Sequence, residues 1–346
     1  MAQSRVAIIG TGLIGASIGL GLTAQKERKF EIIGADRDRS HANEAKRIGA
    51  IDRAVGSLEE AVSGTGLIII AVPASGVRHT LKEIGPLLMP GAIVTDTAST
   101  KARVMEWANE FLPPTVHFIG GHPMAGREKS GPGAASADLF KDANWALTPS
   151  PRASEQAISV ILGLIEALGA NPIYIDPAEH DQYAAAVSHV PILLSVALFR
   201  MLRDSVGWED ASLLAGPAFR DLTRLASRDP TMSADIMATN REAVRHWIVR
   251  YQQSLNAIVQ ALDEGDDVVH ALFQTTQFDR DSFIANPPFR RAPEGNADPG
   301  SSSDAIGRLL MGGGYDKMKE ILNRQPSLPK DDPKLRRRLG APDDEP

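Results

Sequence analysis

Short apolar runs alternate with amphipathic stretches along the first half of the chain. Seven of the runs have the length and apolar character of buried strands, and they span residues 5–10, 30–35, 67–72, 92–95, 117–120, 145–148 and 172–175. Between them, apolar positions at helical spacing predict helices at 13–24, 41–48, 77–87 and 155–168. Because strands that alternate with helices form a parallel sheet with crossover helices, this half predicts an α/β domain.

The pattern changes at Asp176. Asp176 is suited to cap a helix, Pro177 to occupy its first position, and Glu179 to complete a capping box. From there to residue 283 only helical periodicity is found, including a long amphipathic stretch at 232–262. A helical second domain is therefore expected to follow the α/β domain.

These patterns divide the chain into three parts. Residues 1–175 form the α/β domain, and residues 176–285 form the helical domain. Residues 286–346 begin with a stretch rich in Pro, Gly and Ser, which is typical of a linker. One more helix is expected at 304–323, and the role of this extension is left open.

Composition narrows the class of protein. With 346 residues, 43% of them hydrophobic, the chain can bury two sizeable cores. The 37 basic and 43 acidic residues give a net charge of -6, which favours neither nucleic acid nor an anionic membrane as a partner. Cysteine is absent, so neither disulfides nor thiolate metal sites are expected, and no metal is predicted. No apolar run approaches the ~20 residues of a membrane span, and we expect a cytoplasmic protein.

A glycine-rich turn follows the first predicted strand and opens the first helix. In a dinucleotide site, the first glycine permits a tight turn, the second admits the pyrophosphate, and the third allows close helix–strand packing. The helix N-terminus also offers free amides to phosphate. The motif predicts a Rossmann-type, doubly wound sheet whose cofactor-binding residues include Gly10, Gly12, Leu13, Ile14 and Gly15.

Asp36 ends the second predicted strand, about 20 residues beyond the last glycine. A carboxylate there accepts hydrogen bonds from the ribose of NAD and repels the 2′-phosphate of NADP. NAD is therefore the predicted cofactor, although Arg37 leaves tolerance of a 2′-phosphate open. Val72 and Pro73 end another strand at the same edge, where they are either cofactor contacts or a plain strand terminator.

Two further segments end strands at that edge of the sheet. His122 is flanked by glycines and Pro123, which predicts a loop position close to the cofactor. An imidazole is suited to accept a hydroxyl proton while hydride leaves the same carbon. A histidine that only hydrogen-bonds to backbone is an equal alternative. Ser99 is a second candidate, but a serine in that turn can also simply cap the next helix.

The helical domain carries candidates of its own. His189 shares a helix face with Asp181, and the helix is expected to end at Val190 and Pro191. A lone buried histidine is more often a satisfied core residue than a ligand. Arg220 and Arg224 are four residues apart, hence on one helix face, and a guanidinium is suited to hold a carboxylate. A solvated helix face is the alternative for this pair.

Five segments in order resemble one enzyme family. GTGLIG, VTDTASTK, FIGGHPMAG, SHVP and FRDLTRLASRDP are similar to segments of the prephenate and arogenate dehydrogenases, over roughly residues 5–285. The resemblance implies NAD-dependent oxidation and decarboxylation of prephenate, in tyrosine biosynthesis. By that resemblance His122 is the base that binds the ring hydroxyl, and Ser99 hydrogen-bonds to the same hydroxyl. Arg224 holds a substrate carboxylate, His189 lines the pocket, and the helical domain forms a homodimer.

The chain departs from the family pattern at two positions. Many prephenate-specific members have a second histidine where this chain has Ile192, and many have a tryptophan where it has Met232 or a neighbour. Arogenate, or both substrates, therefore stays open beside prephenate. A β-hydroxyacid dehydrogenase would not explain the GGHPMAG segment. A non-catalytic NAD-binding sensor would have no reason to combine His122, Ser99 and Arg224.

Overall fold

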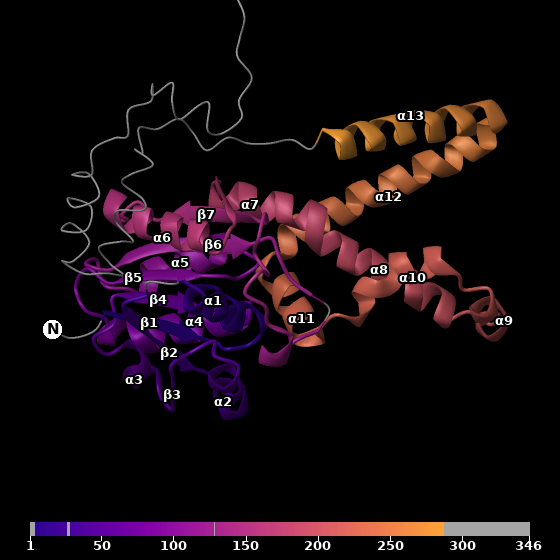
Figure 1. Ribbon diagram of the computed structural model, residues 1–346. Helices are drawn as coiled ribbons and strands as arrows, with labels where there is room; N and C mark the ends of the chain where they lie inside the picture. Colours follow the sequence, from indigo (N-terminus) through magenta and orange to yellow (C-terminus); the bar gives the residue numbers. More distant parts are fainter. Residues whose placement is uncertain (1–3, 26–27, 128, 287–346) are drawn as a thin grey trace, which may run out of the picture.

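The computed structural model describes residues 4–25, 28–127 and 129–286, which form an α/β part and a helical part (Figure 1). The strands are β1 (Ser4–Ile9), β2 (Phe30–Ala35), β3 (Arg53–Val55), β4 (Leu67–Ile70), β5 (Ile93–Asp96), β6 (His117–Pro123), β7 (Asn144–Pro149) and β8 (Asn171–Tyr174). The helices of the α/β part are α1 (Leu13–Thr23), α2 (Arg39–Arg47), α3 (Leu58–Val62), α4 (Ala74–Ile84), α5 (Ala102–Phe111) and α6 (Glu155–Ala167), with short 3-10 turns η1 (Gly85–Leu87) and η2 (Pro132–Ala134).

The helical part follows β8 without a further strand in the described residues. Its elements are α7 (Pro177–Ala184), the π-helical turn η3 (Ala185–His189), α8 (Val190–Arg203), α9 (Trp208–Leu213), α10 (Pro217–Thr223), the 3-10 turn η4 (Arg224–Ser227), α11 (Pro230–Thr239), α12 (Arg241–Glu264) and α13 (Asp266–Ala285). Together the two parts confirm the predicted fold class.

The eight strands form one sheet in the order β3-β2-β1-β4-β5-β6-β7-β8. The strand order reverses between β1 and β4, and ligands of such sheets bind outside the carboxyl ends of the strands at this reversal. Strands β1 to β6 pair in parallel, whereas β7 runs antiparallel to β6. The expectation of a parallel sheet throughout is corrected here. The described residues between β6 and β7 contain the short turn η2 and no α-helix, and an α-helix is the usual crossover between parallel strands.

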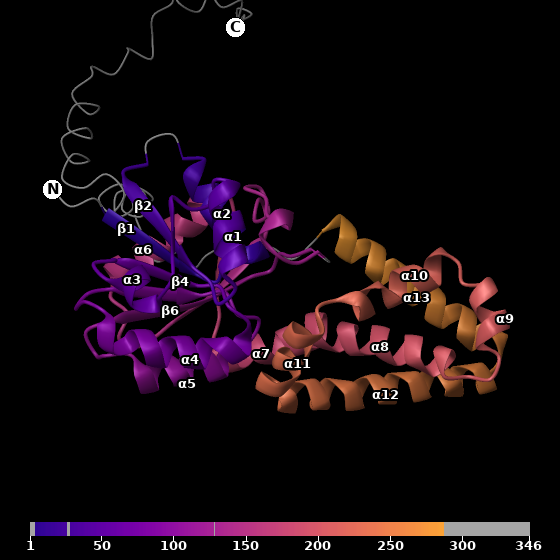
Figure 2. The same ribbon diagram turned by 90° about the horizontal axis from the view of Figure 1, so that it is seen from below.

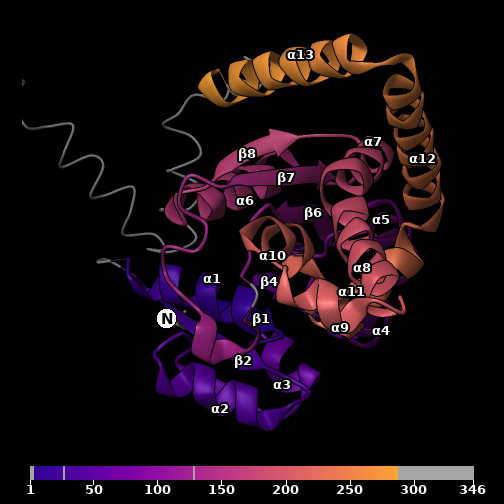
Figure 3. The same cartoon turned by 90° about the vertical axis from the view of Figure 1, so that its right-hand side faces the viewer.

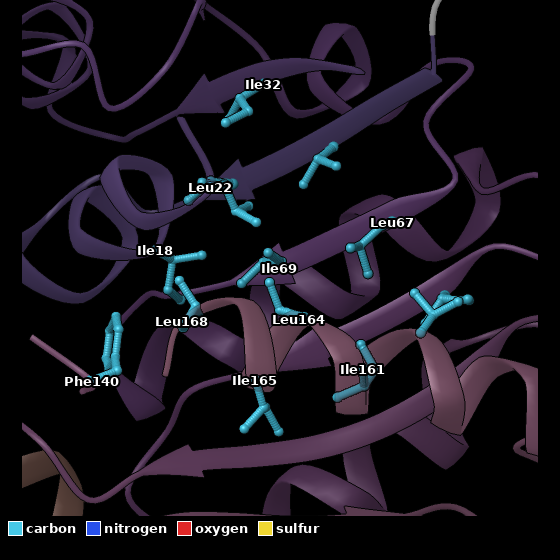
Figure 4. Close-up of a cluster of buried hydrophobic side chains, with 14 of the residues drawn as sticks. Ile18, Leu22, Ile32, Leu67, Ile69, Phe140, Ile161, Leu164, Ile165 and Leu168 are labelled. Atoms are coloured by element: carbon cyan, nitrogen blue, oxygen red, sulfur yellow. The ribbon is translucent and has the colours of Figure 1, made fainter. Parts of the chain in front are cut away.

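Both faces of the sheet are covered, and each has its own apolar core. Successive strand residues point to opposite faces, so Ile8 and Ile32 join one core while Ala7 and Ile33 join the other. Figure 4 shows the first core, in which α1 and α6 pack on the strands. Helices α3, α4 and α5 cover the opposite face. Burial on both faces explains why these strands are apolar runs without alternation.

One predicted helix differs from the structure in an informative way. The stretch 232–262 is not one helix, because Asn240 (φ -129°, ψ 33°) separates α11 from α12. The Asn240 side chain is buried and donates a hydrogen bond to the backbone oxygen of Asp181. This tertiary contact is invisible to helical periodicity. The short elements β3, α3 and α5 were not predicted.

The helix that begins after Asp176 starts as predicted and ends later than predicted. The Asp176 carboxylate accepts from the backbone amides of Ala178 and Glu179. The chain then continues through η3 into α8 and does not stop at Pro191, which lies in the first turn of α8. The widened π turn accommodates a proline that cannot donate an amide hydrogen bond.

The resulting continuous run, Pro177–Arg203, is long and apolar enough to cross a membrane by length and composition alone. The expectation that no run reaches this length is therefore wrong. Its first turns nevertheless carry the buried pair His180 and Asp181, which hydrogen-bond with the α/β part. Several apolar side chains farther along it, among them Val187 and Met201, are exposed.

The long consecutive helices α12 and α13 extend away from the α/β part (Figures 1, 2 and 3). Residues in α13 are largely exposed and none is buried; Phe273 and Phe278 are 70% and 71% exposed. Residues 287–346, with the predicted linker and the helix at 304–323, lie outside the described residues.

Candidate active site

The glycine-rich turn has the geometry that a dinucleotide phosphate site requires. Gly10 has φ +90°, and a side-chain carbon on Gly15 would lie 1.9 Å from the backbone oxygen of Gly10. A side-chain carbon on Gly12, by contrast, would meet nothing within 4 Å. The first turn of α1, which includes Leu13 and Ile14, has neither an acidic residue nor a side-chain cap on its amides. The turn therefore leaves open space and free amide donors where a pyrophosphate would lie.

Asp36 is hydrogen-bonded to this turn. Its Oδ2 accepts from the backbone amide of Thr11 over 2.7 Å and from the Thr11 hydroxyl over 3.2 Å. Its Oδ1 accepts from the backbone amide of Asp38 over 2.9 Å. Its carboxylate is thereby fixed at the carboxyl end of β2.

Val72 and Pro73 follow β4 at the same edge. The Val72 side chain lies 3.0 Å from the position that a side-chain carbon on Gly10 would take, so it packs against the glycine turn. Pro73 occupies the N-cap position of α4. The structure thus brings both residues to the predicted crevice.

His122 is not in a loop. It lies in β6, where it pairs with Ala146 of β7, and it is 7% exposed. The flanking glycines serve close packing inside the sheet, since a side-chain carbon on Gly121 would lie 2.6 Å from the backbone oxygen of Asp96. The prediction of a loop is corrected, whereas its place at the carboxyl end of a strand is as expected.

A buried ion pair connects β5 to β6 beneath His122. The Lys101 ammonium contacts the Asp96 carboxylate and donates to the backbone oxygen of Gly121 over 2.7 Å. Asp96 in turn accepts from the amide of Gly121 over 3.2 Å. Lys101 and Asp96 are 0% exposed. Desolvation lowers the pKa of Lys101, while Asp96 opposes this effect.

Asp181 joins the helical part to the α/β part. Its Oδ1 accepts from the backbone amide of Lys101 over 2.6 Å, and its Oδ2 accepts from that of Ala102 over 3.0 Å. The same Oδ1 lies 2.8 Å from Nδ1 of His180. The other ring nitrogen of His180, Nε2, lies 2.8 Å from Nδ1 of His122.

His189 is completely buried. Its Nδ1 lies 3.2 Å from the side-chain nitrogen of Asn240. Its Nε2 makes no hydrogen bond with the described residues. The nearby backbone of Ser99 raises the pKa of His189, because it stabilises the charged imidazolium. Burial outweighs this effect and lowers the pKa of His189 to about 4.

Several neighbours also affect His122. Burial, and then the positive charges of His180, Lys101 and His189, lower the pKa of His122 well below 6.5. Both histidines are consequently neutral at pH 7. The structure therefore brings together His122, His189 and the backbone of Ser99, and a neutral imidazole is the form that can accept a proton.

The two arginines are placed differently from the prediction. Helix α10 ends at Thr223, so Arg220 and Arg224 do not share one continuous α-helix. Both are exposed, and Arg224 begins η4, which packs against α8. Arg228, at the end of the same turn, lies 3.6 Å from the position of a side-chain carbon on Gly126, in the loop after His122.

Sequence reasoning missed five residues of this cluster: Lys101, Asp96, His180, Asp181 as a hydrogen-bonding partner, and Asn240. Asp96 and Lys101 stand in the segment that the sequence assigns to the carboxyl edge, and their charges after a buried strand were the available signal. His180 and Asp181 lie close to the predicted cap at Asp176. No sequence pattern pairs them with His122.

The comparison with known proteins decides the family. Residues 20–174 match the family model described as prephenate dehydrogenase, nucleotide-binding domain, and residues 176–275 match the one described as prephenate dehydrogenase, dimerization domain. The prephenate dehydrogenase of Lactococcus lactis subsp. cremoris is 36% identical over 267 residues, which are 76% of this chain and 73% of that protein.

The chain belongs to the prephenate dehydrogenase family. The resemblance read from the sequence is thereby confirmed, and with it the class of enzyme, an oxidoreductase.

Two solved structures of the prephenate dehydrogenase family have similar folds. Prephenate dehydrogenase from A. aeolicus, in complex with hydroxyphenyl propionate and NAD+, gives a TM-score of 0.74 at 27% identity and covers 81% of this chain and 99% of that chain. Synechocystis arogenate dehydrogenase gives a TM-score of 0.69 at 30% identity, with coverage of 81% and 99%. The family therefore includes enzymes named for either substrate.

Proposed function

We propose that the protein is an NAD-dependent prephenate dehydrogenase, which converts prephenate to 4-hydroxyphenylpyruvate and CO2 with reduction of NAD to NADH. The observation that carries this proposal is the place of His122. It is a buried, neutral imidazole at the same edge of the parallel strands as an open glycine turn. This arrangement is what oxidation of a hydroxyl-bearing carbon requires.

The glycine turn and its neighbours would hold NAD. Gly12 leaves space for the pyrophosphate, α1 offers its amides, and Asp36 faces the ribose. The proposed cofactor-binding residues are Gly10, Gly12, Leu13, Ile14, Gly15, Asp36, Val72 and Pro73. When bound, the nicotinamide supplies the hydride acceptor.

The protein's own residues then act on the ring hydroxyl of the substrate. His122 accepts the proton of the ring hydroxyl, and Ser99 orients that hydroxyl. Oxidation of the carbinol carbon leaves a dienone, and loss of the ring carboxylate as CO2 makes the ring aromatic. Because aromatisation drives this loss, no group must protonate the departing carboxylate.

Two further residues would bind the substrate. Arg224 holds a carboxylate through its guanidinium, which suits planar, bidentate recognition. His189 accepts at Nδ1 from Asn240, so its neutral form carries hydrogen on Nε2. That donor is buried and makes no hydrogen bond with the described residues, which supports a role in holding an oxygen of the substrate.

Arogenate is the second candidate substrate. The buried Ile192 replaces a histidine that many prephenate-specific relatives carry, and its side chain offers no hydrogen-bond donor. An assay that measures NADH and CO2 with prephenate, arogenate and a 3-hydroxyacid separates the candidates. Production of both with prephenate supports the proposal, and production with arogenate alone supports the alternative. Oxidation of the 3-hydroxyacid alone would contradict both.

We further propose a cytoplasmic homodimer built through residues 176–285, with residues 1–175 as the nucleotide-binding domain and 286–346 as a separate extension. The support is the exposed apolar surface of α8, α12 and α13, which a second copy would cover. The match of the second domain to a dimerization domain supports the same assembly.

A further inference from the structure

Three hydrogen-bonded side chains extend from His122, the predicted base, into the helical domain. Nδ1 of His122 lies 2.8 Å from Nε2 of His180, and Nδ1 of His180 lies 2.8 Å from Oδ1 of Asp181. His122 is in β6 and the other two are in α7, so the chain crosses the boundary between the two domains. All three side chains are buried.

Asp181 fixes which atoms donate and which accept in these hydrogen bonds. The Asp181 carboxylate accepts from the backbone amides of Lys101 and Ala102, and a backbone amide can only donate. Oδ1 accepts from Lys101 and also contacts His180. Asp181 is thereby held as an acceptor, so His180 donates to it from Nδ1–H.

The tautomer of His122 follows from that of His180. A neutral imidazole carries one hydrogen, so His180 with hydrogen on Nδ1 has a bare Nε2 that accepts. Its partner Nδ1 of His122 must then donate. This leaves Nε2 of His122 without hydrogen, as the nitrogen of that ring that can accept a proton.

We propose that His180, oriented by Asp181, is a positioning residue that fixes His122 in the tautomer with hydrogen on Nδ1 and a bare Nε2. The inference rests on the proposed function for the meaning of that bare nitrogen, which is the atom that would take the hydroxyl proton. The two histidines meet edge to face, with ring centroids 5.0 Å apart and an interplanar angle of 72°. In this arrangement the nitrogen of one ring lies beside that of the other while the ring faces do not stack.

The same arrangement stabilises His122 after it has taken the proton. Its Nδ1–H then donates from an imidazolium to His180, and the Asp181 carboxylate lies one ring farther away. Burial lowers the pKa of His122 most, and positive charge on His180, Lys101 or His189 lowers it further. Neutral His180 accepts the hydrogen bond from Nδ1–H of His122, and the negative charge of Asp181 lies at the far end of the same hydrogen-bonded group.

Two substitutions at one position test the inference. Gln at position 180 keeps an amide oxygen that can accept from Nδ1 of His122, whereas Leu has comparable bulk and no acceptor. In the full-length protein, labelled with 15N at its histidines and without substrate, NMR shifts report which ring nitrogen of His122 carries hydrogen. His122→Asn assigns the signal, and His79→Gln, at an exposed position on α4, is the matched control.

The unmodified protein should show hydrogen on Nδ1 of His122, as should His180→Gln and the control. His180→Leu should show a mixture of tautomers. With prephenate, His180→Leu should lower kcat about 100-fold, within the range for general-base catalysis. His180→Gln should restore kcat to within about 10-fold of the unmodified enzyme. The KM for NAD should stay unchanged in both variants, which a merely structural role would not predict.

The failures of this inference and of the proposed function are distinguishable. Hydrogen on Nε2 of His122 in the unmodified protein, or an unchanged tautomer in His180→Leu, overturns the inference even if prephenate is oxidised. Equal loss of kcat in His180→Gln and His180→Leu overturns it as well. Absence of activity toward prephenate in the unmodified protein would overturn the proposed function while leaving the NMR result to decide the tautomer.

Discussion

The backbone amide of Thr11 donates a hydrogen bond to Oδ2 of Asp36 over 2.7 Å. This contact joins the glycine-rich turn after β1 to the end of β2, although the two residues are 25 positions apart in the sequence. It holds the carboxylate where the ribose of a dinucleotide would lie. The contact therefore connects the shape of the phosphate site to the choice of cofactor.

The first prediction concerns that choice. The unmodified enzyme should use NAD with a kcat/KM at least about ten times that for NADP, since a repulsive contact worth about 1.4 kcal/mol gives that factor. Asp36→Ser should narrow the gap, because a hydroxyl does not repel a 2′-phosphate. Steady-state kinetics with both cofactors measure the effect. Equal use of the two by the unmodified enzyme would mean that Arg37 governs the site.

The second prediction separates two glycines of the same turn. Gly12→Ala should fold with a melting temperature close to that of the unmodified protein, because the added carbon meets nothing within 4 Å. It should nevertheless weaken NAD binding strongly, because the carbon fills the space for the pyrophosphate. Calorimetric titration with NAD and thermal unfolding measure the two effects.

Gly15→Ala is the matched control for that experiment. Its added carbon would lie 1.9 Å from the backbone oxygen of Gly10, so the turn must distort and the protein should lose stability. If Gly12→Ala binds NAD normally while remaining folded, the pyrophosphate does not lie at this turn.

These glycines show what a sequence can predict. The turn and its strand–helix context are local, so the sequence places them correctly, and the same holds for the cap at Asp176. The His122–His180–Asp181 chain is different, because β6 and α7 are brought together only by the packing of two domains. Asn240 likewise interrupts a stretch with helical periodicity, and its side chain hydrogen-bonds to the backbone of Asp181, which is distant in the sequence. Local patterns therefore predict the cofactor site better than the cluster around His122.

The third prediction is a homodimer that depends on the helical domain. An obligate interface of this kind should bury well over ~2,000 Å² in total. Leu262 of α12 and Phe273 of α13 are 62% and 70% exposed in the single chain. Replacing each with Glu should shift sedimentation toward the monomer, whereas Lys46→Glu, on α2 of the other domain, should not. Monomeric behaviour of the unmodified, active protein at micromolar concentration would contradict the prediction.

The fourth prediction concerns stability and pH. His189 has a pKa of about 4 in the folded protein, against an ordinary value of 6.5. Below pH 6.5 the unfolded chain therefore binds a proton that the folded protein does not. The free energy of unfolding should fall as pH falls from 6.5 to about 4, by up to about 1.4 kcal/mol per pH unit for this group. Above pH 6.5 its contribution should be constant.

Denaturant unfolding at several pH values measures this slope. His189→Asn removes the titrating group and should flatten the slope by about one proton, while His122 still contributes in the same direction. An unchanged slope in His189→Asn would show that His189 is not buried in its neutral form.

The central claim is that His122 is the base. The most direct measurement is the single-turnover rate of NADH formation from prephenate by His122→Asn, beside the NAD affinity of the same variant. Asn keeps a hydrogen-bonding side chain but cannot take the hydroxyl proton. The rate should fall by roughly 100- to 10,000-fold, with NAD affinity nearly unchanged. A near-normal rate with prephenate, or with arogenate if that is the substrate, would contradict the claim and make His189 the next candidate.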